Sequence, residues 1–156
     1  MKINRSLLVA AALSLAATLT SFAANAHIGV WKLNEAKSKF SPGAAKNHTV
    51  TYAEARGDKI KLTVDGVDKD GKPIHWTWIG KFDGKPYKIK GSAVGDMAMY
   101  KPIDDHANEL TIMKDGKAVV TGMIRVSKDG KSRVVTTTMI GADGKKHTDK
   151  AYYTRG

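Results

Sequence analysis

Five Asp-Gly-Lys tripeptides recur along this chain and constrain its fold more than any other feature. They stand at residues 70–72, 83–85, 115–117, 129–131 and 143–145. A tight primed hairpin turn needs positive φ at its central residues, and Asp and Gly tolerate that conformation best. Most of the five separate two short stretches in which apolar and polar residues alternate, which is the period of a β-strand. The spacing therefore predicts an antiparallel meander of hairpins.

The alternation predicts about ten strands, at residues 28–33, 48–56, 59–65, 74–82, 87–91, 97–103, 109–114, 117–127, 131–140 and 146–155. The sequence is compatible with a helix only at residues 34–40. There Asn34 could cap one or two turns, and Ser41-Pro42-Gly43 would end them. A meander of this length disposes of its edge strands most simply by closing. We therefore expect an all-β, antiparallel up-and-down β-barrel of about eight to ten strands, with at most a short helix after the first strand. Such a barrel is wide enough to hold a small ligand.

The first 26 residues have the features of an export signal. Lys2 and Arg5 precede an apolar run over residues 6–19, and Ala24-Asn25-Ala26 fits the A-x-A site of signal peptidase. The apolar run is too short for a membrane-spanning helix. We expect cleavage after Ala26, a single folded domain over residues 27–156, and a periplasmic or secreted location. Because the chain has no cysteine, it forms no disulfide and carries no lipoprotein anchor.

The net charge limits the possible partners. The chain has 26 Lys and Arg against 15 Asp and Glu, and loss of Lys2 and Arg5 leaves 24 basic residues in the mature protein. These residues are scattered singly, and export separates them from nucleic acid, so we expect no nucleic-acid partner. An anionic membrane or lipopolysaccharide surface stays open as a partner. An outer-membrane barrel is disfavoured, because the predicted strands carry charges on both faces and show no apolar band with aromatic girdles.

Residues at both ends of the predicted barrel resemble a known superfamily. Gly29-Val30-Trp31 opens the first strand, and Tyr152-Tyr153-Thr154-Arg155 ends the last. A Gly-x-Trp with a basic residue that closes the barrel on it resembles the signature of the calycin superfamily, which contains lipocalins and fatty-acid-binding proteins. The wider pattern at residues 31–34, 37–40 and 127–131 is similar to small exported bacterial lipocalin-like proteins. The resemblance implies a lipocalin-like β-barrel over residues 27–156.

The physical role of the signature residues Gly29, Trp31 and Arg155 can be explained without the family resemblance. A Trp inside one end of a barrel buries a large flat surface and plugs that end. An Arg laid over its face gains about 0.5 to 2 kcal/mol of cation–π attraction. We expect these three residues to be structural.

The candidate ligand-binding residues lie on several predicted strands. Trp76 and Trp78 share a strand face with Ile74 and Phe82, where they either pack in the core or line a cavity. Met97 and Met99 face one way together, and their flexible thioethers suit an adaptable apolar pocket or an ordinary core. The expected ligand contacts are Trp76, Trp78, Tyr87, Met97 and Met99, with Arg125 or Tyr153 as a polar anchor.

Two registers are open for Arg125. If Val119, Thr121 and Met123 face inward, Arg125 lies inside the barrel and needs an anion, because a buried unpaired charge is very costly. The alternate face is more apolar and places Arg125 on the surface. That alternate face consists of Ala118, Val120, Ile124 and Val126.

Catalytic and metal-binding motifs are not found. The sequence has no cysteine nucleophile, Gly-x-Ser-x-Gly, phosphate loop or His-Glu-x-x-His. The histidines at positions 27, 48, 75, 106 and 147 lack the short spacing of zinc ligands. We therefore expect no catalytic residue, no metal and no cofactor. A copper site remains open, because cleavage would make His27 the amino terminus, whose amine and imidazole can chelate copper with a second histidine.

Two functions fit these observations. The favoured one is a non-enzymatic exported binding protein that holds a small hydrophobic or amphipathic ligand inside the barrel. The alternative is a structural or interaction module, with a barrel filled by its own side chains, whose basic surface binds anionic envelope components.

Overall fold

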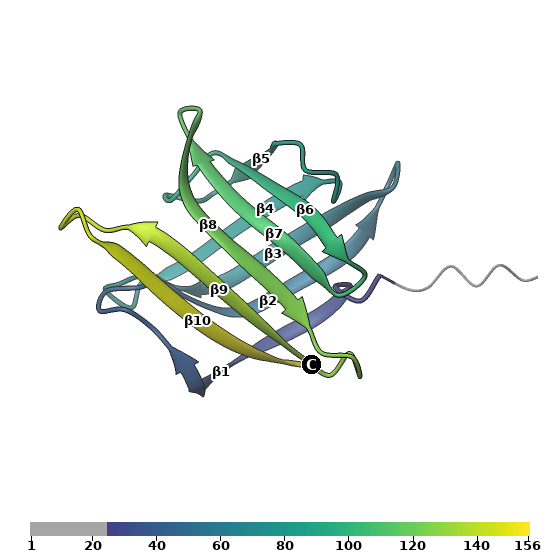
Figure 1. Ribbon diagram of the computed structural model, residues 1–156, viewed down its shortest axis with the longest axis horizontal. Coiled ribbons are helices and arrows are strands. Elements are labelled where there is room, and N and C mark those ends of the chain that lie inside the picture. Colours follow the sequence, from purple (N-terminus) through teal and green to yellow (C-terminus); the bar gives the residue numbers. More distant parts are fainter. Residues whose placement is uncertain (1–24) are drawn as a thin grey trace, which may run out of the picture.

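The computed structural model describes residues 25–156, so nearly all of the expected export signal lies outside the described residues. Ten antiparallel strands form one closed barrel, in which each strand pairs with its neighbours in sequence and the last pairs with the first (Figure 1). The strands are β1 (Gly29–Lys39), β2 (Lys46–Ala55), β3 (Lys59–Val67), β4 (Pro73–Gly80), β5 (Tyr87–Lys90), β6 (Met97–Asp104), β7 (Ala107–Lys114), β8 (Lys117–Val126), β9 (Ser132–Ile140) and β10 (Lys146–Arg155). The predicted all-β closed barrel is confirmed.

The helix predicted at residues 34–40 is wrong, because β1 continues through this segment to Lys39. Asn34 pairs with Tyr152 and Lys39 pairs with Lys150, so four residues of β1 bulge outward against one residue of β10. Asn34 still behaves as a cap: its Oδ1 accepts a hydrogen bond from the Lys37 amide at 3.1 Å. The local capping interaction therefore forms inside a β-bulge. Within residues 25–156 there is no helix that could cross a membrane.

The five Asp-Gly-Lys turns all place glycine at positive φ, between 69° and 77°. Only Asp115-Gly116 has both residues in that region, with φ of 51° and 76°, as a primed two-residue turn requires. In the other four the Asp has no positive φ. The loop at Gly130 shows why: the Gly130 amide donates to the Ser127 carbonyl at 2.9 Å, and the Asp129 carboxylate accepts from the Lys131 amide at 3.0 Å. This is a turn followed by a left-handed glycine, a longer hairpin connection.

Strand register decides which side chains enter the barrel. Directly paired residues on neighbouring antiparallel strands project from the same face. Trp76 pairs with Val64 and Trp78 with Leu62, and both partners are fully buried, so Trp76 and Trp78 point inward. On β8 the apolar face predicted from the sequence is turned inward at Val120, Ile124 and Val126.

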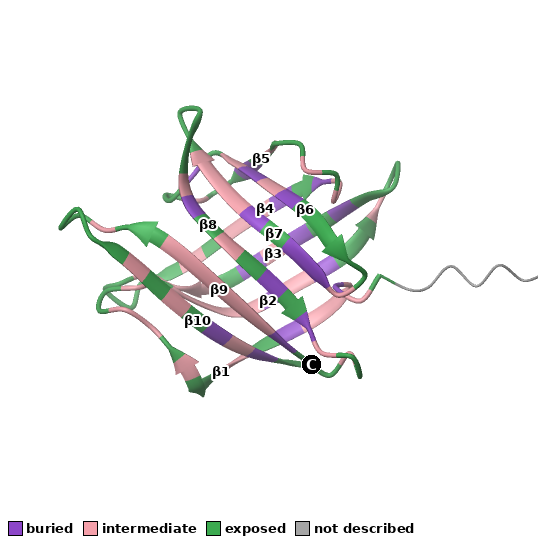
Figure 2. Ribbon diagram, in the orientation of Figure 1, coloured by how far each residue is buried: buried purple, intermediate pink, exposed green. Residues whose placement is uncertain are grey.

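The two ends of the barrel differ in burial. We call the end that carries Gly29 and Arg155 the closed end, and the opposite end the mouth. On β10 the buried residues Ala151 and Tyr153 lie toward the closed end, whereas the β9–β10 hairpin tip at the mouth is exposed (Figure 2). The packed core is therefore concentrated away from the mouth.

We expect Gly130→Val to lower the free energy of unfolding by about 1–3 kcal/mol, because φ at Gly130 is 69° and β-branched residues are strained there. Space is not the problem: the nearest atom to an added Cβ is Arg155 Nη2 at 3.8 Å. Gly130→Asn is the control, since Asn tolerates this conformation, and it should cost clearly less. Urea unfolding of both variants measures the difference, and equal stabilities would contradict the turn geometry.

Candidate ligand-binding site

The closed end is built on Trp31, which is fully buried. The Arg155 guanidinium carbon lies 4.4 Å from the centroid of the Trp31 ring, and the indole N–H donates to the His27 carbonyl at 2.9 Å. Arg155 also donates to the carbonyls of Gly130, Ile28 and Ala26. A single side chain thus ties the last strand to the β8–β9 loop and to the segment before β1.

Gly29 fits this arrangement in two ways. Its φ is 134°, a backbone conformation that other residues rarely adopt. A Cβ at this position would also collide with the Arg155 guanidinium. The Gly-x-Trp sequence is therefore required by the contact between Arg155 and the start of β1.

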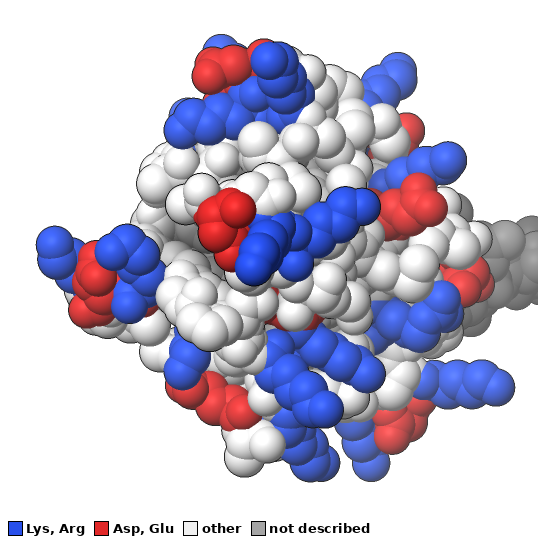
Figure 3. All heavy atoms as spheres, turned by 60° about the vertical axis from the view of Figure 1, so that its left-hand side comes forward, with Lys and Arg blue, Asp and Glu red and all other residues white. Residues whose placement is uncertain are grey.

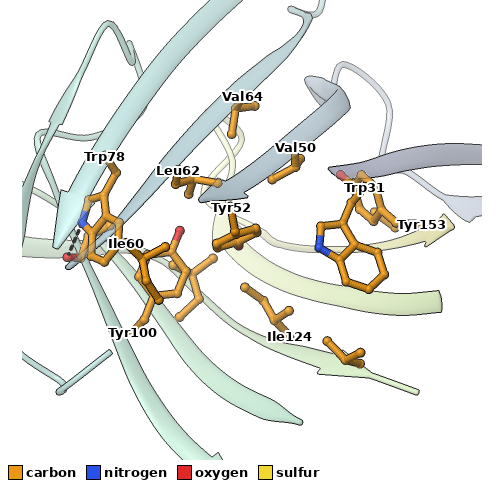
Figure 4. Packing of buried hydrophobic residues seen from close by; sticks show 14 of the residues in the cluster. Trp31, Val50, Tyr52, Ile60, Leu62, Val64, Trp78, Tyr100, Ile124 and Tyr153 are labelled. Atoms are coloured by element: carbon orange, nitrogen blue, oxygen red, sulfur yellow. Dashed lines mark hydrogen bonds between the residues drawn. The ribbon is translucent and has the colours of Figure 1, made fainter. Parts of the chain in front are cut away.

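Aromatic side chains fill the middle of the barrel (Figure 4). Trp78 lies against Tyr100, with ring centroids 4.7 Å apart, and against Tyr87 at 5.8 Å. The Trp78 indole donates to the Ala98 carbonyl at 3.2 Å. Tyr52 lies between this group and Trp31 in Figure 4, so the core runs without interruption to the closed end.

Three polar side chains are buried at the closed end, and we call them the closed-end cluster: His27, Asn108 and Arg133. Each is only 2% exposed. Both ring nitrogens of His27, Nδ2 of Asn108, and Nε and Nη1 of Arg133 are buried without a hydrogen-bond partner among the described residues. Buried polar atoms are nearly always hydrogen-bonded, so this cluster is unusual for a folded core.

Arg133 enters the barrel because it pairs with Val126 on one side and with Tyr153 on the other, and both are buried. Its guanidinium lies over three aromatic rings, at 4.7 Å from the centroid of Tyr153 and 5.1 Å from those of Trp31 and Tyr52. Cation–π contacts compensate part of the cost of burying this charge. No carboxylate of residues 25–156 forms an ion pair with it.

Burial shifts the ionisation of groups around the cluster. Desolvation, followed by the charge of Arg133, lowers the pKa of His27 to about 4. The imidazole is therefore neutral at pH 7. Desolvation also raises the pKa of Tyr153 to about 12, and the Tyr153 hydroxyl donates to the Asn47 carbonyl at 3.0 Å. These groups keep the interior uncharged apart from Arg133.

The mouth is lined by inward side chains that are only half-buried. Ile74 and Trp76 come from β4, Ile112 from β7, and Val135, Thr137 and Met139 from β9. Their inward direction follows from the register: Ile112 and Met139, for example, both pair with the buried Val120. Met139 is nevertheless 37% exposed. Near the mouth, solvent therefore reaches apolar side chains inside the barrel.

The sequence-predicted ligand contacts occupy different places. Trp76 lies at the mouth, whereas Trp78 and Tyr153 are buried in the core. Tyr87 is half-buried, and its hydroxyl donates to Asp83 Oδ2 at 2.8 Å. Of these four, only Trp76 lies where a molecule entering through the mouth would meet it.

Met97, Met99 and Arg125 point away from the interior, contrary to the expectation for a ligand site inside the barrel. On β6 the inward positions belong to Ala98 and Tyr100, which are fully buried, so the two methionines lie on the outer face. Arg125 is exposed and donates to Asp104 at 3.5 Å. Burying an apolar face outweighs any benefit of turning this guanidinium inward.

The interior arginine is Arg133, which the sequence analysis did not single out. A usable signal was present: residues 127–131 form the β8–β9 connection, and Arg133 lies opposite Val126. Once Val126 is assigned to the inward face, Arg133 must follow it.

Within residues 25–156, no group of three His, Asp or Glu side chains could hold a metal ion.

Comparison with solved structures supports the fold. The chain is similar to a mutant of the fluorescent protein UnaG, with a TM-score of 0.54 and 18% sequence identity over 83% of this chain and 95% of that one. No protein-family model and no curated protein matches the chain. At this identity the similarity concerns the fold alone, and it agrees with the antiparallel β-barrel expected from the sequence.

We expect the folded protein to lose stability as the pH falls from about 6.5 to 4. In this window the unfolded chain protonates His27, whose ordinary pKa is about 6.5, while the folded protein, with a pKa of about 4, does not. The loss amounts to at most about 3 kcal/mol. His27→Leu should remove this part of the pH dependence in urea unfolding. A His27 imidazole that titrates near pH 6.5 in the NMR spectrum of the folded protein would contradict the burial of His27.

Proposed function

We propose that the protein binds a small hydrophobic or amphipathic molecule through the mouth of the barrel, without chemical conversion. The observation that carries this proposal is the set of inward, only partly buried apolar side chains of β4, β7 and β9 at the mouth, above the buried core. Ligand sites in proteins are concave, mostly apolar and lined by a few polar groups. The mouth offers Trp76 and Ile74 as apolar surface and Thr137 as a polar neighbour.

The packed core sets the depth of the proposed site. Trp78 and Tyr100 fill the middle of the barrel, so a bound molecule rests on this aromatic group instead of reaching Trp31. Trp76, Ile112 and Val135 are partly exposed and already contact the core. A ligand that covers them removes further apolar surface from water, which stabilises the complex by about 25 cal/mol per Å².

The alternative proposal, a basic surface that binds anionic envelope components, rests on the charge of the chain. Lys and Arg outnumber Asp and Glu, 26 to 15. On the face drawn in Figure 3 the basic side chains stand in several separate groups, most of them with acidic side chains beside them. This mixed surface favours the mouth over the exterior as the binding site.

A matched pair of substitutions on β4 tests the proposal. Ile74 points into the mouth, while Ile79 on the same strand points outward and is 49% exposed. We expect Ile74→Ala to weaken binding of the neutral fluorescent probe N-phenyl-1-naphthylamine, and Trp76→Ala to weaken it about tenfold, because each removes buried apolar contact. Ile79→Ala removes the same atoms as Ile74→Ala from the outer face and should leave the affinity within about twofold.

The salt dependence separates the two proposals. Affinity that arises from apolar burial should change little between about 0.05 M and 0.5 M NaCl, whereas exposed charges are strongly screened over this range. Saturable binding that ignores Ile74→Ala and Trp76→Ala would contradict the mouth as the site. Binding of anionic vesicles that disappears at high salt, with no probe binding, would support the basic surface in its place.

A further inference from the structure

The closed-end cluster has a chemistry that the proposed apolar site does not use. Arg133 and Asn108 together present three buried N–H-bearing atoms without acceptors: Nε and Nη1 of Arg133 and Nδ2 of Asn108. His27 adds a neutral imidazole, which can donate or accept according to its tautomer. An unpaired buried charge is among the most expensive features of a folded protein. The cluster therefore has an excess of donors and one uncompensated positive charge.

The aromatic rings around Arg133 offset part of the cost of burying its charge, but they do not replace the missing hydrogen-bond acceptors. Tyr153, Trp31 and Tyr52 offer ring faces within about 5 Å of the guanidinium carbon. The Tyr153 hydroxyl donates to the Asn47 carbonyl, and it accepts no hydrogen bond from Nε or Nη1 of Arg133. Carboxylates and phosphates match an arginine fork through two parallel hydrogen bonds. An oxyanion is thus the ligand that supplies what the rings do not.

Residues of the cluster help to line two surface depressions at the closed end. One surface depression of about 520 Å³ is lined by Arg133, together with His106, Arg125 and Lys128. A second, of about 320 Å³, is lined by His27 and Asn108. Both depressions also include Asp104 and Asp105, so both adjoin the turn between β6 and β7.

The carboxylate of Asp104 is itself engaged. It accepts hydrogen bonds from the His106 amide at 2.8 Å and from Arg125 at 3.5 Å. The His106 amide, followed by Arg125, holds the pKa of Asp104 below its ordinary value. Asp104 therefore stays on the rim with these partners and leaves the charge of Arg133 uncompensated.

We propose that the closed end is a second binding site, which takes a small free oxyanion of the carboxylate or phosphate class on Arg133. The anion enters through the depressions beside the β6–β7 turn and does not pass through the mouth. We treat this site as independent of the apolar site at the mouth, because Trp78, Tyr100 and Tyr52 belong to a buried core that reaches the closed end.

The experiment measures the melting temperature of the protein in sodium phosphate or sodium acetate against sodium chloride at the same ionic strength and pH 7. We expect a saturable rise, of about 4 °C when the anion is at ten times its Kd. Arg133→Met should abolish the rise. Arg56→Met, the same change at a residue that lines neither depression, should keep it.

A second measurement on the parent protein keeps the test valid if Arg133→Met does not fold. The Nε–H resonance of Arg133 should shift with phosphate concentration and give the same Kd as the melting data. If the Nε–H resonance of Arg133 does not shift, and the melting temperature is the same in phosphate, acetate and chloride, the proposal is overturned. Water would then be the hydrogen-bond partner of Arg133.

Decanoate distinguishes a free anion from the acidic headgroup of a ligand in the interior. If Arg133 responds to decanoate but not to acetate or phosphate, the cluster receives a headgroup and the proposal fails. Saturating phosphate should also leave the affinity for N-phenyl-1-naphthylamine unchanged. Displacement of the probe by phosphate would show a single shared site and would also overturn the proposal, while the apolar function of the mouth would stand.

Discussion

The closure of the barrel depends on the contact between Arg155 and Trp31. Trp31 and Arg155 are direct partners in the pairing of β1 with β10, which joins the two ends of the meander. The guanidinium lies on the indole ring and donates to three carbonyls from two other segments. Such charge-assisted hydrogen bonds are about twice as strong as neutral ones. Without the pairing of β1 with β10 the chain would have two free edge strands, which sheet proteins must cover or pair.

Closure at one end makes the two halves of the interior unlike. Near Trp31 the inward side chains are large, aromatic and fully buried, and they enclose the polar closed-end cluster. Toward the mouth the inward side chains, such as Trp76, Ile74 and Val135, are only partly buried, and solvent reaches them. One barrel therefore offers an apolar surface at the mouth and a donor-rich, positively charged site at the closed end.

Much of this fold could be predicted from the sequence, because its signals are local. The glycine turns, the strand alternation and the Gly-x-Trp of Gly29 and Trp31 each depend on a few neighbouring residues. The bulge at Asn34 could not be distinguished from a helix, since the same capping hydrogen bond serves both. The outward direction of Met97 and the inward direction of Arg133 depend on register across strands, which a single strand does not reveal.

The three tryptophans provide the most direct test of the central claim that the ends of this barrel act separately. Trp31 lies at the closed end, Trp78 in the packed middle and Trp76 at the mouth, and each has its own indole N–H resonance. Titration with N-phenyl-1-naphthylamine should shift the Trp76 resonance strongly and leave that of Trp31 in place. A titration that moves Trp31 and leaves Trp76 unchanged would contradict the account.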